Sequence, residues 1–261
     1  MGTDSRDMEC QALCNRLDEE LDTAAYADID RSANGLQVGS GEREVEHVAV
    51  AVDAAIATIE RAAEVGADLL VTHHGIFWGG TDRLTGQEYD RVAALLENEM
   101  SLYVSHLPLD GHRTMGNAAL IADHLDLEGT ASFGQRGEEY VGQRGTLPNP
   151  TSIETVCDRL QPHLDGEGGL TVLDFGPQTV MRVAIVTGAG VDFLDEAVDA
   201  GADVFITGEG KQRVYHQARE HGIHVVLGGH YATETFGVRA LADLVDGWGL
   251  RTTFVDHPTG L

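Results

Sequence analysis

Two adjacent histidines end an apolar segment of the chain. Residues 68–75 read Asp-Leu-Leu-Val-Thr-His-His-Gly, so the apolar run stops at His73 and His74 and a glycine follows. A short apolar run closed by glycine is typical of a buried strand, and open α/β sheets bind ligands at the C-terminal ends of such strands. Because neutral imidazole is the commonest metal ligand among side chains, the pair indicates a metal site. The alternative is a loop whose histidines make only structural hydrogen bonds.

Two more predicted strands, 101–105 and 224–227, are followed by a histidine and, four residues later, by an acidic residue. The residues are His106 and Asp110 after the first strand and His230 and Glu234 after the second. A helix that begins at His230 would carry His230 and Glu234 on one face. At 106–110, Pro108 favours a turn instead.

The three strand ends together supply more imidazole and carboxylate groups than a single metal ion needs. Such mixed sites suit zinc, manganese, iron or nickel, so the pattern predicts two divalent metal ions per chain. The set consists of His73, His74, His106, Asp110, His230 and Glu234. In an acid-rich chain with 12 histidines, some histidines follow strands by chance, but the repeated His-x3-acid spacing favours metal binding.

The elements that must position these residues form an α/β pattern. Helical periodicity is found in 8–24, 55–65, 87–98, 117–127 and 152–164, with strands such as 47–52 between. The strand, helix and strand within 47–75 also lie over 182–210 without a gap, and nine of the 29 positions are identical. Two related α/β units are therefore predicted. In the second unit Gly208 and Glu209 replace the paired histidines.

The predicted domain boundaries follow a glycine-rich segment. Gly134, Gly137, Gly142 and Gly145 are expected to mark turns or hairpin corners between about 129 and 149. We predict a first α/β domain from residues 1–128 plus about 228–261, which carries the ligands, and a second from about 129–227.

Composition restricts the classes of partner. Asp and Glu outnumber Lys and Arg 43 to 17, for a net charge of −26, which disfavours general nucleic-acid binding and is typical of a protein from a very salty cytoplasm. No apolar stretch approaches the roughly 20 residues of a membrane helix, and residues 1–11 lack the pattern of a secretion signal. A cytoplasmic, halophilic protein without membrane partners is expected.

The motifs as a set resemble the Nif-three-like dinuclear metal-centre family, whose members are also called GTP cyclohydrolase I type 2 homologues. The resemblance covers nearly the whole chain and includes 34–39 (Asn-Gly-Leu-Gln-Val-Gly), 52–54, 71–75, 106–110, 207–209 and 229–234. It implies that the metal ligands are His73, His74, Asp110, His230 and Glu234. His106 then belongs to the surroundings of the metals or to the wall of the cleft. The chain departs from many members at Gly75, where they have proline, and at Glu209, where they have aspartate.

The resemblance further implies two α/β domains that flank a dinuclear cleft, assembled into a homohexamer. Two divalent ions can share a bridging water of lowered pKa, so the implied chemistry is hydrolysis. The expected substrate is a nucleotide or another phosphate-containing small molecule, with Asp110 or Glu234 as the bridging carboxylate, although the sequence contains no glycine-rich phosphate-binding fingerprint. The alternatives are a regulatory or interaction protein with structural metals, and a protein of metal storage or delivery.

Overall fold

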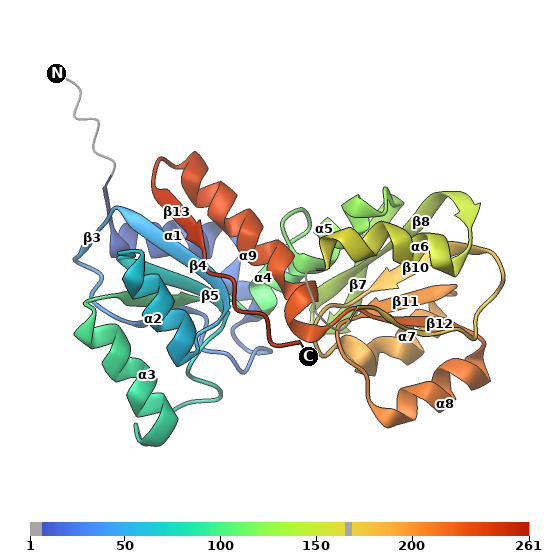
Figure 1. The fold of residues 1–261 in the computed structure, drawn as a ribbon, viewed down its shortest axis with the longest axis horizontal. Coiled ribbons are helices and arrows are strands. Elements are labelled where there is room, and N and C mark those ends of the chain that lie inside the picture. Colours follow the sequence, from blue (N-terminus) through green and yellow to red (C-terminus); the bar gives the residue numbers. More distant parts are fainter. Residues whose placement is uncertain (1–6, 165–168, 261) are drawn as a thin grey trace. The chain divides into compact units, whose positions relative to one another are not determined.

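The structure is a computed structural model that describes residues 7–164 and 169–260 (Figure 1). The chain forms two compact units, which are described separately. The first unit contains the residues up to Leu109 and returns with Val238–His257, and the second contains Asp110–Gly237 and the segment from Pro258. Among the described residues, no helix is both long enough and apolar enough to cross a bilayer.

The first unit is built on a five-stranded sheet in the order β13-β4-β5-β6-β2. The first four strands are mutually parallel, and β2 pairs antiparallel with β6. The strands are β2 (Gly35–Val38), β4 (His47–Asp53), β5 (Leu69–His74), β6 (Ser101–Val104) and β13 (Arg251–Phe254), and β1 (Met8–Glu9) pairs with β3 (Glu44–Val45) apart from this sheet. The helices are α1 (Cys10–Glu20), η1 (Thr23–Tyr26), α2 (Ile56–Glu64) and α3 (Gly86–Glu97).

Apolar residues of β4 and β5 are buried along nearly their whole length, as expected for parallel strands that are covered on both faces. One core cluster joins Ile59 of α2, Leu70 of β5 and Leu95 of α3. Each of these side chains is completely buried. The cluster therefore fixes the strand whose last two residues are His73 and His74.

The second unit is built on a six-stranded sheet in the order β7-β8-β10-β11-β12-β9. Strands β10, β11 and β12 are parallel, while β8 and β9 flank them in antiparallel pairing. The strands are β7 (Glu128–Arg136), β8 (Glu139–Thr151), β9 (Thr171–Leu173), β10 (Val180–Ile185), β11 (Val204–Thr207) and β12 (His224–Leu227). The helices are α5 (Asn117–His124), α6 (Ile153–Leu160), η2 (Gln161–His163), η3 (Gly190–Phe193), α7 (Leu194–Asp199) and α8 (Gln212–His221).

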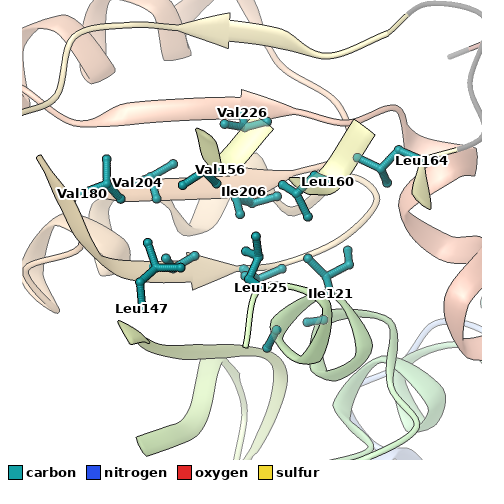
Figure 2. Packing of buried hydrophobic residues seen from close by; sticks show 14 of the residues in the cluster. Ile121, Leu125, Leu147, Val156, Leu160, Leu164, Val180, Val204, Ile206 and Val226 are labelled. Atoms are coloured by element: carbon teal, nitrogen blue, oxygen red, sulfur yellow. The ribbon is translucent and has the colours of Figure 1, made fainter. Parts of the chain in front are cut away.

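The core of the second unit lies between its sheet and two helices. Figure 2 shows Ile121 of α5 and Leu160 of α6 turned toward the apolar strand residues Val204, Ile206 and Val226. All five side chains are fully buried.

Two helices cross the division between the units. Helix α4 (Leu107–Gly111) follows β6, and α9 (His230–Gly247) follows β12. The prediction of a turn at 106–110 is therefore wrong. Pro108 is the second residue of the helix, where an amide hydrogen would have no partner within the helix, so proline is tolerated.

The internal repeat is confirmed by equivalent backbone contacts. In the first unit Asp68 Oδ2 accepts hydrogen bonds from the amides of Glu46 and His47, both at 2.9 Å. In the second unit Asp203 Oδ2 accepts from the amides of Met181 and Arg182, at 3.0 and 2.8 Å. The two aspartates hold the same place in their units, between the helix and the second strand. The α/β fold class with two related domains follows from these equivalences.

The glycine-rich segment forms one long hairpin. Gly137, with φ +62°, lies in the turn between β7 and β8, as predicted. Gly142 and Gly145 are not corners but lie inside β8. At Gly142 a Cβ atom would lie 2.2 Å from the carbonyl oxygen of Ile185, so glycine is needed for close approach of the strands rather than for a turn.

Candidate metal centre

Three imidazoles gather at the ends of β5 and β6 in the first unit. The ring centroids of His73 and His74 are 4.8 Å apart, and that of His106 lies 5.1 Å from His73 and 5.7 Å from His74. One nitrogen from each ring lies within 4.8 Å of the others. The sequence therefore placed these histidines at one sheet edge correctly, and it is the parallel pairing of β5 with β6 that brings the rings together.

Each of the three imidazoles is oriented through its Nδ1 atom. His73 Nδ1 lies 2.9 Å from the carbonyl oxygen of Ser105, and His74 Nδ1 lies 2.9 Å from Asp53 Oδ1. A carbonyl oxygen can only accept, so His73 carries its proton on Nδ1 and presents Nε2 as a ligand atom. A metal-binding histidine typically donates its other nitrogen to a carbonyl or carboxylate in this way.

His106 is held in the same way by a buried carboxylate that the sequence reasoning missed. Its Nδ1 lies 2.9 Å from Asp30 Oδ1, and Asp30 also accepts from Asn34 Nδ2 at 2.8 Å and from the amide of Leu107 at 2.9 Å. Burial alone would raise the pKa of Asp30, but hydrogen bonding and charge from His106, with the bonds from Asn34 and Ser32, lower it to about 2. Asp30 is thus a fixed negative charge behind His106.

Asn34 is more than a turn residue. Besides its bond to Asp30, its Oδ1 accepts a hydrogen bond of 2.8 Å from the amide of His106. The loop that leads into β2 is thereby tied to the end of β6. This explains why a polar residue from the start of the chain takes part in positioning an imidazole more than 70 residues away.

The second unit carries an imidazole between two carboxylates. His230 and Glu234 lie in the first turns of α9, and His230 Nε2 is 3.2 Å from Glu234 Oε2. His230 Nδ1 is 3.3 Å from Oε2 of Glu209, which follows β11. The predicted helical pairing of His230 with Glu234 is confirmed, because α9 begins at His230 and the four-residue spacing places both on one face.

The charge around His230 favours its protonated form. Burial by itself lowers the pKa of His230, but hydrogen bonds and charges from Glu234 and Glu209 outweigh burial and raise it to about 9. A metal ion and a proton would compete for Nε2 of His230. The group of one imidazole and two carboxylates therefore attracts either a metal ion or a proton.

Asp110 is positioned by polar side chains of the second unit. Its Oδ1 accepts from Asn117 Nδ2 at 2.9 Å and from Thr187 Oγ1 at 3.3 Å. Asn117 is completely buried, and its Oδ1 accepts a 2.7 Å hydrogen bond from the amide of Gly237 in α9. Asn117 and Thr187 carried no signal in the sequence, because neither belongs to a recognisable motif.

A glycine after β10 permits the close approach of Glu234. Gly188 has φ +56°, and a Cβ atom there would lie 2.0 Å from Glu234 Oε1. Its amide bonds to Thr233 Oγ1 at 3.1 Å, and its carbonyl oxygen accepts from the amides of Gly208 and Glu209. Gly188 therefore bonds to Glu209 through the backbone and leaves room for the carboxylate of Glu234, which a larger residue would prevent.

The family of the chain is established by comparison with known sequences. A profile described as Duf34/NIF3 (NGG1p interacting factor 3) matches residues 8–259. The chain belongs to this family. A protein of Halobacterium salinarum named GTP cyclohydrolase 1 type 2 homolog is 52% identical, over 97% of this chain and 100% of that protein. A protein of Deinococcus radiodurans with the same name is 40% identical, over 95% of this chain and 93% of that one.

Solved structures agree with this assignment. A protein from Thermus thermophilus superposes with a TM-score of 0.88 and 36% identity, over 97% of this chain and 100% of that one. A protein from Methanocaldococcus jannaschii superposes with a TM-score of 0.85 at 23% identity, over 96% of this chain and 99% of that one, which shows a shared fold. The resemblance drawn from the sequence motifs is confirmed, and so is the fold class.

Proposed function

We propose that the chain is a dinuclear metal-dependent hydrolase that acts on a nucleotide or another phosphate-containing small molecule. In this proposal His73 and His74 of the first unit and Asp110, His230 and Glu234 of the second supply the metal ligands. The observation that carries it is the common orientation of the imidazoles, each of which has Nδ1 at 2.9 Å from an oxygen acceptor. An imidazole that contacts a carbonyl or carboxylate oxygen through Nδ1 is the arrangement typical of a histidine that binds a metal through Nε2, and we assign this role to His73 and His74.

The donor set fits divalent transition metals. Imidazole nitrogen and carboxylate oxygen suit zinc, iron, manganese or nickel, and no soft sulfur ligand takes part. When bound, two such ions supply a water molecule of lowered pKa and stabilise an oxygen that gains negative charge. The proposal that they lie in a cleft between the domains rests on the family resemblance.

The residues of the chain contribute orientation and charge. Ser105 and Asp53 hold the rings of His73 and His74, so that little conformational freedom remains to be lost when a ligand binds. Asp30, whose pKa is lowered to about 2, keeps a negative charge beside Nδ1 of His106. The imidazole of His106, held by this carboxylate, is placed to carry a proton next to the reacting group.

The substrate class rests on the relatives. Proteins 52% and 40% identical to this chain bear the name GTP cyclohydrolase 1 type 2 homolog. A nucleotide substrate would be consistent with ring opening or with phosphate ester hydrolysis, since both need an activated water and stabilisation of a developing negative charge.

A second candidate is a regulatory or interaction protein with structural metals. The family description, NGG1p interacting factor 3, refers to an interaction rather than to a reaction. The complete burial of His73 also favours it, since structural sites are closed whereas catalytic sites keep an open position. We further propose a homohexamer, which the family resemblance implies, in a salt-rich cytoplasm, to which the net charge of −26 is suited.

Hydrolysis by metal-loaded protein tests the proposed function. Protein stripped with a chelator and reloaded with zinc, manganese, iron or nickel would be incubated with GTP and simple phosphate esters, in buffer of high potassium chloride. We expect turnover that disappears with His74→Ala and is retained by His257→Ala, which changes an exposed histidine near the C-terminus. Metal binding without turnover of any of these compounds would contradict the enzyme and favour structural metals.

A further inference from the structure

An exposed indole lies beside the imidazoles of the first unit. Trp78, in the loop after β5, is 39% exposed, and its ring centroid is 5.0 Å from that of His106 in an edge-on arrangement of 78°. The ring of His74 is 6.1 Å away. The indole is held by a 3.1 Å hydrogen bond from Nε1 to the carbonyl oxygen of Gly75. A large aromatic surface is therefore fixed next to the candidate ligands while much of it stays accessible.

An arginine is attached to the same place by backbone pairing. Residue 32 forms an isolated antiparallel bridge with Trp78, and the amide of Gly79 donates to the carbonyl oxygen of Arg31 at 2.7 Å. The Arg31 guanidinium lies over Gly79, with Nη2 3.5 Å from the position that a Cβ atom would take there. Arg31 and Trp78 thus lie on two short segments that are bonded to each other. Residue 30, next to Arg31, is the aspartate that holds His106.

Arg31 is a cation without an acidic partner among the residues that the structure describes, and its side chain is exposed. This is notable in a chain with 43 acidic and 17 basic residues. Other exposed arginines, such as Arg61 and Arg213, form ion pairs with carboxylates. An unpaired guanidinium beside an accessible indole suits a ligand that has both a planar ring and an anionic group.

We propose that Trp78 and Arg31 form the recognition site for the substrate, which is a phosphate-bearing planar heterocycle of the nucleotide type. Trp78 stacks on the heterocycle, and Arg31 pairs with the phosphate. This inference rests on the proposed function, because it takes the reacting group to lie at the neighbouring imidazoles. The ring and the phosphate are recognised by different side chains, so their contributions can be separated by experiment.

The test measures binding of GMP, guanosine and inorganic phosphate by calorimetry, with metal-free and zinc-loaded protein. Trp78→Ala is expected to weaken binding of GMP and of guanosine about tenfold, because it removes the stacking surface. Arg31→Ala is expected to weaken binding of GMP about tenfold and to leave guanosine within roughly twofold, because only the phosphate contact is lost. Trp78→Phe should retain much of the affinity of the wild type, since an aromatic face remains.

Two matched variants serve as controls. Arg61→Ala removes an exposed arginine of α2 that is paired with Glu64, and it should leave GMP binding unchanged. Trp248→Phe removes the other tryptophan, which lies under the guanidinium of Arg16. In this variant Trp78 is the remaining reporter, and its fluorescence should be quenched by GMP. Circular dichroism and zinc content, unchanged in all variants, would establish that the fold and the metal site are intact.

GMP affinity that is unchanged in both Trp78→Ala and Arg31→Ala would overturn the recognition site, even if the wild-type protein hydrolyses a substrate. If Trp78→Ala fails to fold, Arg31→Ala and Trp78→Phe decide the question, because both keep an indole or a phenyl ring at this place. Conversely, the protein could lack hydrolytic activity and still bind GMP through Trp78 and Arg31. This result would support the recognition site and would contradict only the proposed reaction.

Discussion

The two copies of the repeat have the same backbone and different chemistry at the end of the second strand. In the first unit the end of β5 carries His73 and His74, and Asp53 at the end of β4 holds His74 through its side chain. At the equivalent places of the second unit, Gly188 and Glu209 are joined through the backbone, since the amide of Glu209 donates to the carbonyl oxygen of Gly188 at 3.0 Å.

This difference shows how one fold positions candidate metal ligands in two ways. In the first unit, side chains of neighbouring strand ends orient imidazoles. In the second unit, positions 188 and 208 are glycines, and Glu234 and Thr233 of α9 lie where their side chains would be. At Gly208 a Cβ atom would lie 2.7 Å from the carbonyl oxygen of Gly188, so this position has no room for a side chain.

The largest effect is expected when a side chain is added at Gly188, a position of the second copy that has no room for one. Gly188→Ala would place a methyl group 2.0 Å from Glu234 Oε1 at φ +56°, so we expect a loss of roughly 2 kcal/mol or more of unfolding free energy. The control is Gly66→Ala, which also lies at positive φ (+72°) but has no atom within 4 Å of the new Cβ. Equal losses in denaturant unfolding would show that the contact with Glu234 has no importance.

A smaller effect is expected from removing the side-chain support of the first copy. Asp53→Asn weakens the acceptor for His74 Nδ1 and should reduce zinc affinity about 10- to 100-fold, as is usual for such supporting groups. Competition with a chromogenic chelator measures the affinity. Asp90→Asn, an exposed change on α3, removes the same charge and should leave it unaltered. If both variants bind zinc as the wild type does, Asp53 does not support the ligand.

The smallest effects should come from a contact that both copies make, in which an aspartate accepts hydrogen bonds from two backbone amides. Asp68→Asn and Asp203→Asn each weaken two hydrogen bonds from backbone amides, and each should cost about 1 to 2 kcal/mol of unfolding free energy. Asp203 also pairs with Arg182 at 2.9 Å, but the guanidinium is exposed and such ion pairs contribute little, so the two losses should be similar. The free energy is measured by denaturant unfolding. If only one of the two substitutions lowers it, the two contacts are not equivalent.

The dependence of the unfolding free energy on acidic pH gives a further test of this comparison. Burial raises the pKa of Asp203, but the hydrogen bonds from Arg182 and Met181 and the charge of Arg182 outweigh burial and lower it from the ordinary value of 3.8. Because the folded-state pKa is the lower one, the stabilisation by Asp203 is fully present above pH 3.8 and is lost as the pH falls through the lowered value. Asp203→Asn should flatten this part of the stability profile, and Asp90→Asn should not.

Much of the candidate site could be predicted because its residues follow apolar strands. The strand before His73 and His74 is recognisable from local sequence, and the order of strand, helix and strand within 47–75 predicts the parallel pairing of those two strands. Asp30 could not be predicted in this way, since it lies in a loop and reaches His106 only through the folded chain. Pro108 was misleading because its effect depends on whether it lies in the first turn of a helix.

Metal content per chain tests most directly the proposal that residues of both units bind two metals. Elemental analysis would be made on protein purified in high salt, for the wild type, His74→Ala from the first unit and Asp110→Ala from the second. We expect about two ions per wild-type chain and fewer in both variants. Wild-type protein that holds no metal, even after incubation with zinc, manganese or iron, would contradict it.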